Sequence, residues 1–248
     1  MLLAPVRRIC LTTYYPLSNN QLLTALPQLE YSCLAPRLQN CFLESGQILF
    51  EPNEIIEFVY FPNRAMISLV SIMNDGATTE IGLIGNEGMV GLPVLLGGQQ
   101  STSRAIVQVA GDSMRLSAQS FKEVFKVCPE LQRLLLLYIQ AFLTQVSQGA
   151  ACNRQHTIEE RLARWLLSVH DCILEDELPL TQEFVANMLG VRRSGVTVAA
   201  NILQKAGIIH YRRGKITILD HQALESTSCE CYKIVQNEFI RLLGFRRG

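Results

Sequence analysis

Apolar residues between positions 180 and 203 recur at intervals of three and four, which predicts two short helices. Ala186 is small enough for two helices to cross closely, and Gly190 suits a tight turn with a positive φ angle. This spacing indicates a helix-turn-helix. The predicted apolar faces are Phe184, Val185, Met188 and Leu189 on the first helix, and Val196, Ala199, Ala200 and Leu203 on the second.

The outward side chains of the second helix are polar or basic, and such a helix can present hydrogen-bonding groups to base edges in a major groove. These side chains are Arg192, Arg193, Ser194, Thr197 and Asn201. Two short β-rich runs then follow within residues 208–219 and flank the basic sequence Arg212, Arg213, Gly214 and Lys215. A helix-turn-helix with a basic hairpin is a winged helix, in which the hairpin offers cations to phosphates.

Residues 41–118 alternate between apolar and polar positions in short runs separated by turn residues, which predicts a β-roll. Asp75-Gly76 between two such runs is a strong hairpin signal. Residues 1–40 favour a few turns of helix leading into this domain. The predicted fold class is therefore α+β: an N-terminal β-roll (a double-stranded jelly roll), a long dimerisation helix and a C-terminal winged helix-turn-helix.

A glycine-rich stretch at residues 86–105 interrupts the strand pattern. Its backbone amides, together with Arg104, could hold a phosphate. The alternative is that the glycines form turns within the roll and Arg104 is a surface residue. The candidate effector-binding residues on the first interpretation are Gly88, Met89, Gly91, Arg104 and Ala105.

Residues 129–148 predict a helix of about five turns that is apolar over a wide arc. One side can cover the roll, and the other is expected to pair with its symmetry mate in a two-fold dimer. The stripe assigned to this dimer is Leu131, Leu135, Tyr138 and Phe142. We expect three parts: a sensor roll at 1–126, the dimerisation helix at 127–152 and the DNA-binding domain at 153–248.

Two further amphipathic helices are predicted. In the helix at 156–174, residues Glu159, Glu160, Arg161 and Arg164 form a solvated face. The tail from 221 to 245 is expected to be one helix packed on the wing.

The 248 residues carry 22 basic and 22 acidic side chains, which alone argues against a nucleic-acid partner. Their distribution changes the picture, because residues 181–248 hold 10 basic and 5 acidic side chains whereas residues 1–180 hold 12 and 17. Arg7 and Arg8 follow the first apolar residues, which does not suit a signal peptide. The longest apolar run, 134–142, is too short for a membrane span. We therefore expect a cytoplasmic protein without a membrane partner.

Eight cysteines are scattered along the chain. Cys152 and His156 are four residues apart, and Cys229 and Cys231 form a C-x-C pair. Either pair could bind a metal or sense oxidation, but neither pair alone supplies four ligands, so structural thiols are favoured and no metal site is predicted.

The order of these parts resembles the Crp/Fnr family of bacterial transcription regulators. The motifs that carry the resemblance are IGNEGMVG at 84–91, EERLARWLL at 159–167, LTQEFVANMLGVRRSGV at 180–196 and RRGKITILD at 212–220. The resemblance implies a homodimer that binds a two-fold-related site in double-stranded DNA, with RNA polymerase as a further partner and an unidentified small-molecule effector at the roll. Arg193 matches the family arginine that typically reads a guanine.

Family members that bind cyclic AMP usually have Glu after the glycine that Gly88 matches, and a hydroxyl residue after the arginine that Arg104 matches. Here these positions are Met89 and Ala105, which argues against a cyclic nucleotide. Fnr-like members have a tight N-terminal cysteine cluster, whereas Cys10, Cys33 and Cys41 are dispersed, which argues against an iron–sulfur cluster. No cofactor is predicted.

Two functions remain open from the sequence. The first is a sequence-specific transcription regulator that is a homodimer on an inverted-repeat site and is controlled by a signal at the β-roll. The alternative is a ligand- or redox-sensing module with a weak or non-DNA-binding C-terminal domain, which Gly195 and Val198 in the second helix favour. We predict no enzyme activity, because no base and nucleophile occur at catalytic spacing.

Overall fold

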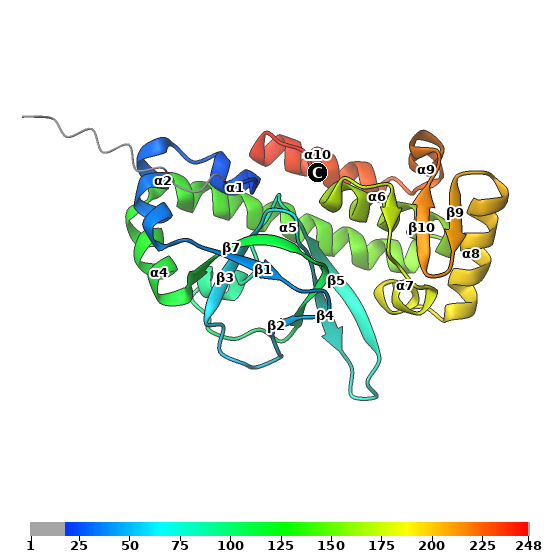
Figure 1. The fold of residues 1–248 in the computed structure, drawn as a ribbon, viewed down its shortest axis with the longest axis horizontal. Helices are drawn as coiled ribbons and strands as arrows, with labels where there is room; N and C mark the ends of the chain where they lie inside the picture. The colour runs from blue at the N-terminus through cyan, green and yellow to red at the C-terminus, as the bar shows by residue number, and fades with distance from the viewer. Residues whose placement is uncertain (1–17, 248) are drawn as a thin grey trace, which may run out of the picture.

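The computed structural model describes residues 18–247. Arg7, Arg8 and Cys10, on which the sequence analysis drew, lie outside the described residues. The described chain begins with two short helices, α1 (Gln21–Thr24) and α2 (Gln28–Leu34), and a 3-10 turn, η1 (Ala35–Arg37). These helices lead into the β-rich domain, as predicted (Figure 1).

Two antiparallel sheets form the β-roll. The first has the order β1-β7-β3 and the second has the order β2-β6-β4-β5. Alternate positions of the strands face a shared apolar core, in which Phe61, Ile67 and Val107 are fully buried. The strands are β1 (Gln39–Leu43), β2 (Ile48–Phe50), β3 (Phe58–Pro62), β4 (Met66–Ile72), β5 (Thr78–Ile84), β6 (Arg104–Val109) and β7 (Gly111–Ser117), with a short helix α3 (Leu92–Leu95) before β6.

The predicted hairpin at Asp75-Gly76 joins β4 to β5, and Gly76 has φ +85°. Its turn is closed by a hydrogen bond from the Met73 amide to the Ala77 carbonyl at 2.8 Å. The β-roll prediction is confirmed in this element and in its two-sheet architecture.

The roll is followed by α4 (Ala118–Val127) and by the long helix α5 (Pro129–Gln155). The winged helix-turn-helix then contains α6 (Ile158–Ile173), β8 (Glu177–Leu178), α7 (Gln182–Leu189), α8 (Arg193–Lys205), β9 (Ile209–Arg212) and β10 (Lys215–Ile218). Its sheet has the order β8-β10-β9. The α+β fold class and the order of roll, long helix and winged helix-turn-helix are confirmed, while the exact domain boundaries stay predictions.

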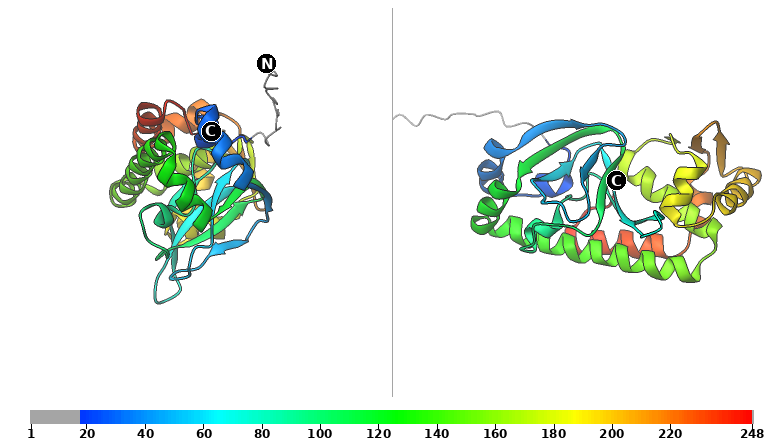
Figure 2. Two further views of the ribbon diagram at one scale, coloured as in Figure 1. Left: turned by 90° about the vertical axis from the view of Figure 1, so that its left-hand side faces the viewer. Right: turned by 90° about the horizontal axis from the view of Figure 1, so that it is seen from below.

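The C-terminal tail differs from the prediction of one helix on the wing. It forms two helices, α9 (His221–Thr227) and α10 (Cys231–Leu243). The helix α9 contacts α6 of the winged domain, whereas α10 touches α6 near its start and then turns back along α5 (Figures 1 and 2). Phe239 of α10 is fully buried and meets the Tyr138 ring edge-on, with 6.3 Å between ring centroids.

This return of α10 corrects the predicted dimer stripe. Leu131, Leu135, Tyr138 and Phe142 are buried within one chain, because the roll and α10 cover the faces of α5 on which they lie. The exposed apolar residues of α5 are instead Leu136 and Leu143, which are 56% and 58% exposed. A helix that is apolar on nearly all sides does not reveal from sequence which face remains free.

By length and composition alone, α5 could cross a membrane, because its 27 residues include an 18-residue window with a mean hydropathy of 1.2. It is longer than the run at 134–142 on which the sequence-based argument rested. Core helices of globular proteins pass the same test. The contacts of α5 with α4, β5 and α10 in this structure are those of such a core helix.

Candidate nucleic-acid interface and sensor domain

The turn between α7 and α8 depends on Gly190. This residue has φ +61°, ends α7, and donates its amide to carbonyls of the last turn. A Cβ atom at Gly190 would lie 2.9 Å from the Thr79 Oγ1 atom of β5. A glycine at this position therefore allows both the left-handed backbone conformation and the close approach of β5 to the turn. Thr181 caps the start of α7 by accepting the Phe184 amide hydrogen at 3.2 Å.

Most of the predicted base-reading side chains of α8 are exposed to solvent. Arg192, Arg193, Ser194 and Asn201 are all exposed. Thr197 is different: it is half-buried, and its hydroxyl lies 2.7 Å from the Gln182 Oε1 atom and 3.1 Å from the Arg193 carbonyl. Thr197 therefore links α8 to α7 and is partly covered, and its assignment to the DNA-binding surface stays a prediction.

The wing is the predicted basic hairpin. Arg212 pairs with Lys215 across β9 and β10, and the two-residue loop Arg213-Gly214 has φ angles of 50° and 79°. Arg212 and Arg213 are exposed, whereas the Lys215 ammonium contacts the Glu177 carboxylate of β8.

Four guanidinium groups of this surface are available to an anion. Among residues 18–247, no carboxylate forms an ion pair with Arg192, Arg193, Arg212 or Arg213. Unpaired cations on α8 and on the wing can neutralise phosphates without first breaking a protein ion pair.

Two apolar residues of α8 that the sequence analysis did not assign to the interface are also exposed. Val198 is 57% exposed and Ile202 is 48% exposed. Ser194, Val198 and Asn201 follow one another at spacings of four and three, so they share one face of α8. An apolar side chain there suits the methyl group of thymine. The same helical spacing could have identified Val198 from the sequence.

Gly195 of α8 packs against α6. A Cβ atom at this position would lie 2.8 Å from the Ile158 Cδ1 atom of α6. Its missing side chain therefore lets α8 lie close to the first turn of α6.

The helix α6 holds the turn between α7 and α8 in place. The Arg161 guanidinium donates through Nη2 to the Leu189 carbonyl near the end of α7, and the side chain is buried. Glu160 accepts the Thr157 amide at 2.8 Å in a capping box. Arg161 is therefore not on a solvated face, contrary to the prediction from amphipathicity.

The glycine loop of the roll does not form an anion cradle, which was one of the two interpretations of this stretch. Its amides have partners in the protein: Gly88 donates to the Gly85 carbonyl at 3.2 Å, and Val90 donates to the Tyr60 carbonyl at 2.8 Å. Met89 is completely buried. A Cβ atom at Gly88 would lie 2.3 Å from the Tyr138 Oη atom. The loop is thus a close contact between the roll and α5.

Arg104 lies apart from this loop. Its guanidinium forms a bidentate ion pair with Glu51, with both N–O distances at 2.8 Å. Ala105 is completely buried, and Gly91, with φ +104°, packs on Val59. The structure therefore does not bring the five candidate effector residues together as one anion site.

Arg104 instead lines a cleft of about 460 Å³ between the roll and α7. Roll residues on one wall include Thr78 and Gln108, and winged-helix residues on the other include Phe184 and Met188. The Gln108 amide also approaches the Met188 sulfur at 3.7 Å. This cleft joins the sensor domain to the first helix of the helix-turn-helix.

Two family models match the chain. Residues 41–127 match the cyclic nucleotide-binding domain, and residues 160–227 match the Crp-like helix-turn-helix domain. The chain belongs to the Crp/Fnr family of transcription regulators. As a Crp/Fnr regulator it is a DNA-binding protein with a sensing domain.

Individual proteins agree with this assignment. The regulator is 24% identical to the "Global nitrogen regulator" of Synechococcus elongatus over 218 residues, which cover 84% of this chain and 96% of the relative. A putative regulator of the crp/fnr family from Eubacterium rectale has the same fold, with a TM-score of 0.66, 20% identity, and coverage of 83% and 96%. FixK2 from Bradyrhizobium japonicum also has this fold, with a TM-score of 0.66, 16% identity, and coverage of 77% and 98%.

Proposed function

We propose that this regulator is a cytoplasmic homodimer that binds an inverted-repeat DNA site through α8 and the wing and responds to a signal at the β-roll. The exposed start of α8 carries this proposal, because its unpaired arginines stand beside a face of base-reading side chains. Crp-family regulators bind DNA and act as dimers, so two copies of α8 would meet two half-sites. RNA polymerase is the expected further partner of the bound dimer.

The dimer would form along the free face of α5. Leu136, Leu143 and Ala150 are exposed and recur every seven residues, which is the spacing of a coiled-coil seam. Because α10 covers a different face of α5, it leaves this stripe open to a second copy. The same face on both subunits satisfies two-fold symmetry.

Each exposed residue of α8 has a role that follows from its chemistry. Arg193 can donate two hydrogen bonds to a guanine, and Asn201 can pair with an adenine. Val198 would contact a thymine methyl group between them. Arg192 and the wing arginine Arg212 would meet phosphates and set the position of the helix.

A selection from random double-stranded DNA tests this proposal. We expect an inverted repeat with half-site centres about 10 base pairs apart or a multiple of that distance. Arg193→Ala is expected to cost about 1–3 kcal/mol on the selected site and little on unrelated DNA. Arg212→Ala is the matched control, because loss of a phosphate contact weakens both kinds of DNA equally. Enrichment of no sequence at all would favour the sensing module without DNA recognition.

An effector at the roll can act on DNA binding through the cleft beside α7. A molecule held there would touch the first helix of the helix-turn-helix as well as β6. We expect Met188→Ala to change the response of DNA binding to such an effector without removing DNA binding itself. Equal responses of the two proteins would exclude this route.

A further inference from the structure

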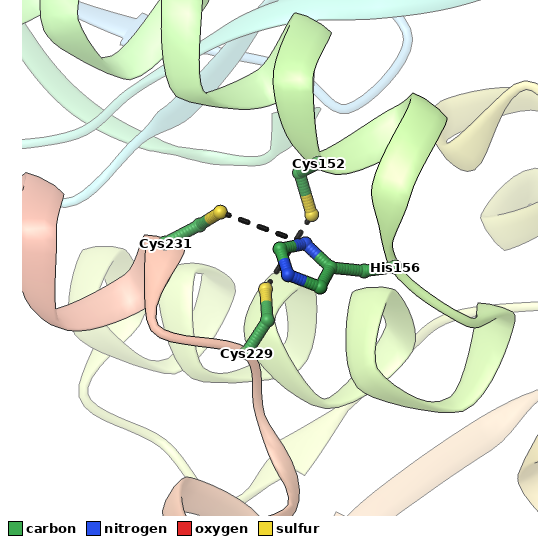
Figure 3. Close-up of side chains that lie close together, drawn as sticks. All are labelled: Cys152, His156, Cys229 and Cys231. Atoms are coloured by element: carbon green, nitrogen blue, oxygen red, sulfur yellow. Dashed lines mark hydrogen bonds between the residues drawn. The ribbon is translucent and has the colours of Figure 1, made fainter.

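Four side chains with metal-binding atoms converge at the junction between the long helix and the DNA-binding domain (Figure 3). Cys152 lies in the last turn of α5, and His156 follows directly at its end. Cys229 lies in the link between α9 and α10, and Cys231 is the first residue of α10. The sequence separates these pairs by more than 70 residues, and the return of α10 along α5 brings them together.

The four ligand atoms all lie within 4.8 Å of one another. The Cys152 and Cys229 sulfurs are 3.4 Å apart, and the Cys231 sulfur is 3.7 Å from the His156 Nδ1 atom. A tetrahedral zinc ion with ordinary zinc–sulfur and zinc–nitrogen bonds has ligands separated by about 3.6–3.8 Å. The observed spacing therefore needs only small side-chain movements to hold such an ion.

The surroundings are those of a metal centre rather than of an apolar core. The three cysteines are buried and form a small cluster separate from the two main hydrophobic cores. With Nδ1 facing the sulfurs, the other ring nitrogen of His156 lies 3.2 Å from the Glu230 carboxylate. A carboxylate on the outer nitrogen of a ligating histidine fixes the ring and raises its basicity.

We propose that Cys152, His156, Cys229 and Cys231 bind one zinc ion in a tetrahedral Cys₃His site. Soft thiolates with an imidazole select zinc over magnesium or calcium, and four protein ligands leave no open position for catalysis. Binding displaces the three thiol protons to solvent. The resulting centre carries a net charge of about −1, which the guanidinium of Arg164, a neighbour of Cys152, offsets.

The place of this site gives the ion a structural role. It would fasten the start of α10 to the end of α5, and its ligand His156 lies two residues before α6 begins at Ile158. The same zinc ion would then fix both the free face of α5 and the position of the winged domain. The proposed site does not depend on which DNA sequence is bound or on whether an effector exists.

Metal analysis of the full chain, purified under reducing conditions without a chelator, tests the proposal directly. We expect about one zinc ion per chain. After removal of zinc, titration with Co²⁺ is expected to give the visible bands of tetrahedral cobalt and a thiolate-to-cobalt charge-transfer band for three sulfurs, saturating at one equivalent.

Three variants locate the site. Cys229→Ser/Cys231→Ser is expected to lose the zinc and the charge-transfer band. Glu230→Gln, which removes only the support of His156, is expected to weaken zinc binding by about 10-fold. Cys33→Ser is the matched control, because this exposed cysteine lies outside the cluster, and it is expected to keep the zinc of the parent chain.

Several results would overturn the proposal. They are a chain that holds no zinc and gives no tetrahedral cobalt spectrum, a Cys152–Cys229 disulfide in place of the ion, or an iron–sulfur absorption. Zinc retained in full by the double serine variant would place the ion elsewhere. Because the cobalt titration uses the unaltered chain, the conclusion does not depend on whether the variants fold.

Discussion

The buried ion pair between Arg247 and Glu87 is expected to contribute strongly to stability. The side chains are 3% and 1% exposed, and the Arg247 Nε atom lies 3.1 Å from Glu87 Oε1. Arg247 also donates to the Leu83 carbonyl at 3.1 Å, and the other Glu87 oxygen accepts the Gly85 amide at 3.0 Å. Burial alone would lower the pKa of Arg247, but the combined effect of Glu87, Cys172 and Asp171 outweighs burial and raises that pKa.

Arg247→Ala is expected to destabilise the protein by about 3–5 kcal/mol, because it leaves the Glu87 carboxylate buried without its counter-charge. Urea unfolding at pH 7, followed by circular dichroism, measures this loss as a lower midpoint with an unchanged slope. Arg246→Ala is the matched control, since this neighbouring arginine is exposed and its loss should stay within about 0.5 kcal/mol.

The double variant Glu87→Gln/Arg247→Met separates the charge from the packing. Removal of both charges leaves no unpaired carboxylate. The double variant should therefore lose less free energy of unfolding than the sum of the losses in Glu87→Gln and Arg247→Ala. If Arg247→Ala behaves like Arg246→Ala, the pair carries no stability and the reasoning from burial fails.

Three other properties can be tested in the same way. Gly88→Ala should lower the free energy of unfolding in urea by about 1–3 kcal/mol, because its Cβ meets the buried tyrosine of α5. Gly149→Ala, with open space around its Cβ, should not lower it. Equal effects of the two substitutions would contradict the close contact at Gly88. Burial raises the pKa of Asp171 to about 6, above its ordinary value of 3.8, so the stability that this carboxyl contributes while protonated is lost as pH rises through about 4–6. Between pH 4 and pH 7, the free energy of unfolding of Asp171→Asn should therefore fall by up to about 3 kcal/mol less than that of the parent chain. If the free energies of unfolding of the two proteins, measured with urea, change in parallel with pH, this reasoning is refuted. Leu143→Asp should give monomers in sedimentation velocity while Leu96→Asp, on the roll, should not; dimers in both would exclude the free face of α5.

The sequence predicted the DNA-binding end well because its determinants are local. The turn at Gly190, the faces of α7 and α8, and the hairpin around Arg213-Gly214 follow from spacings of two to four residues. The partial burial of Thr197 was not predicted, because its partner, Gln182, lies on another helix. A helical pattern predicts which side chains point outward but not which of them a neighbouring helix covers.

The long-range arrangement could not be predicted from such patterns. The Arg247–Glu87 pair joins residues 160 positions apart, and the Cys152–Cys229 contact joins residues 77 positions apart. Both depend on the return of α10 along α5, which amphipathicity allowed but did not specify. The error about the dimer face of α5 has the same origin, since α10 and the roll decide which apolar residues stay exposed.

The strand β5 is the element through which the roll touches the output domain. It packs on α5, α6 and α7, whereas the main contacts of α8 are with α6, α7 and β9. The Trp165 indole of α6 donates to the Glu80 carboxylate of β5 at 2.9 Å, and Ser68 of β4 donates to the same carboxylate at 2.5 Å. A shift of β5 would therefore have to carry α6 and α7 with it or break a partly buried charged hydrogen bond, at a cost of about 1.5–3 kcal/mol. That energy is comparable with the coupling free energies of allosteric proteins, which are about 1–3 kcal/mol, so this contact would oppose a movement of β5 that left α6 and α7 in place.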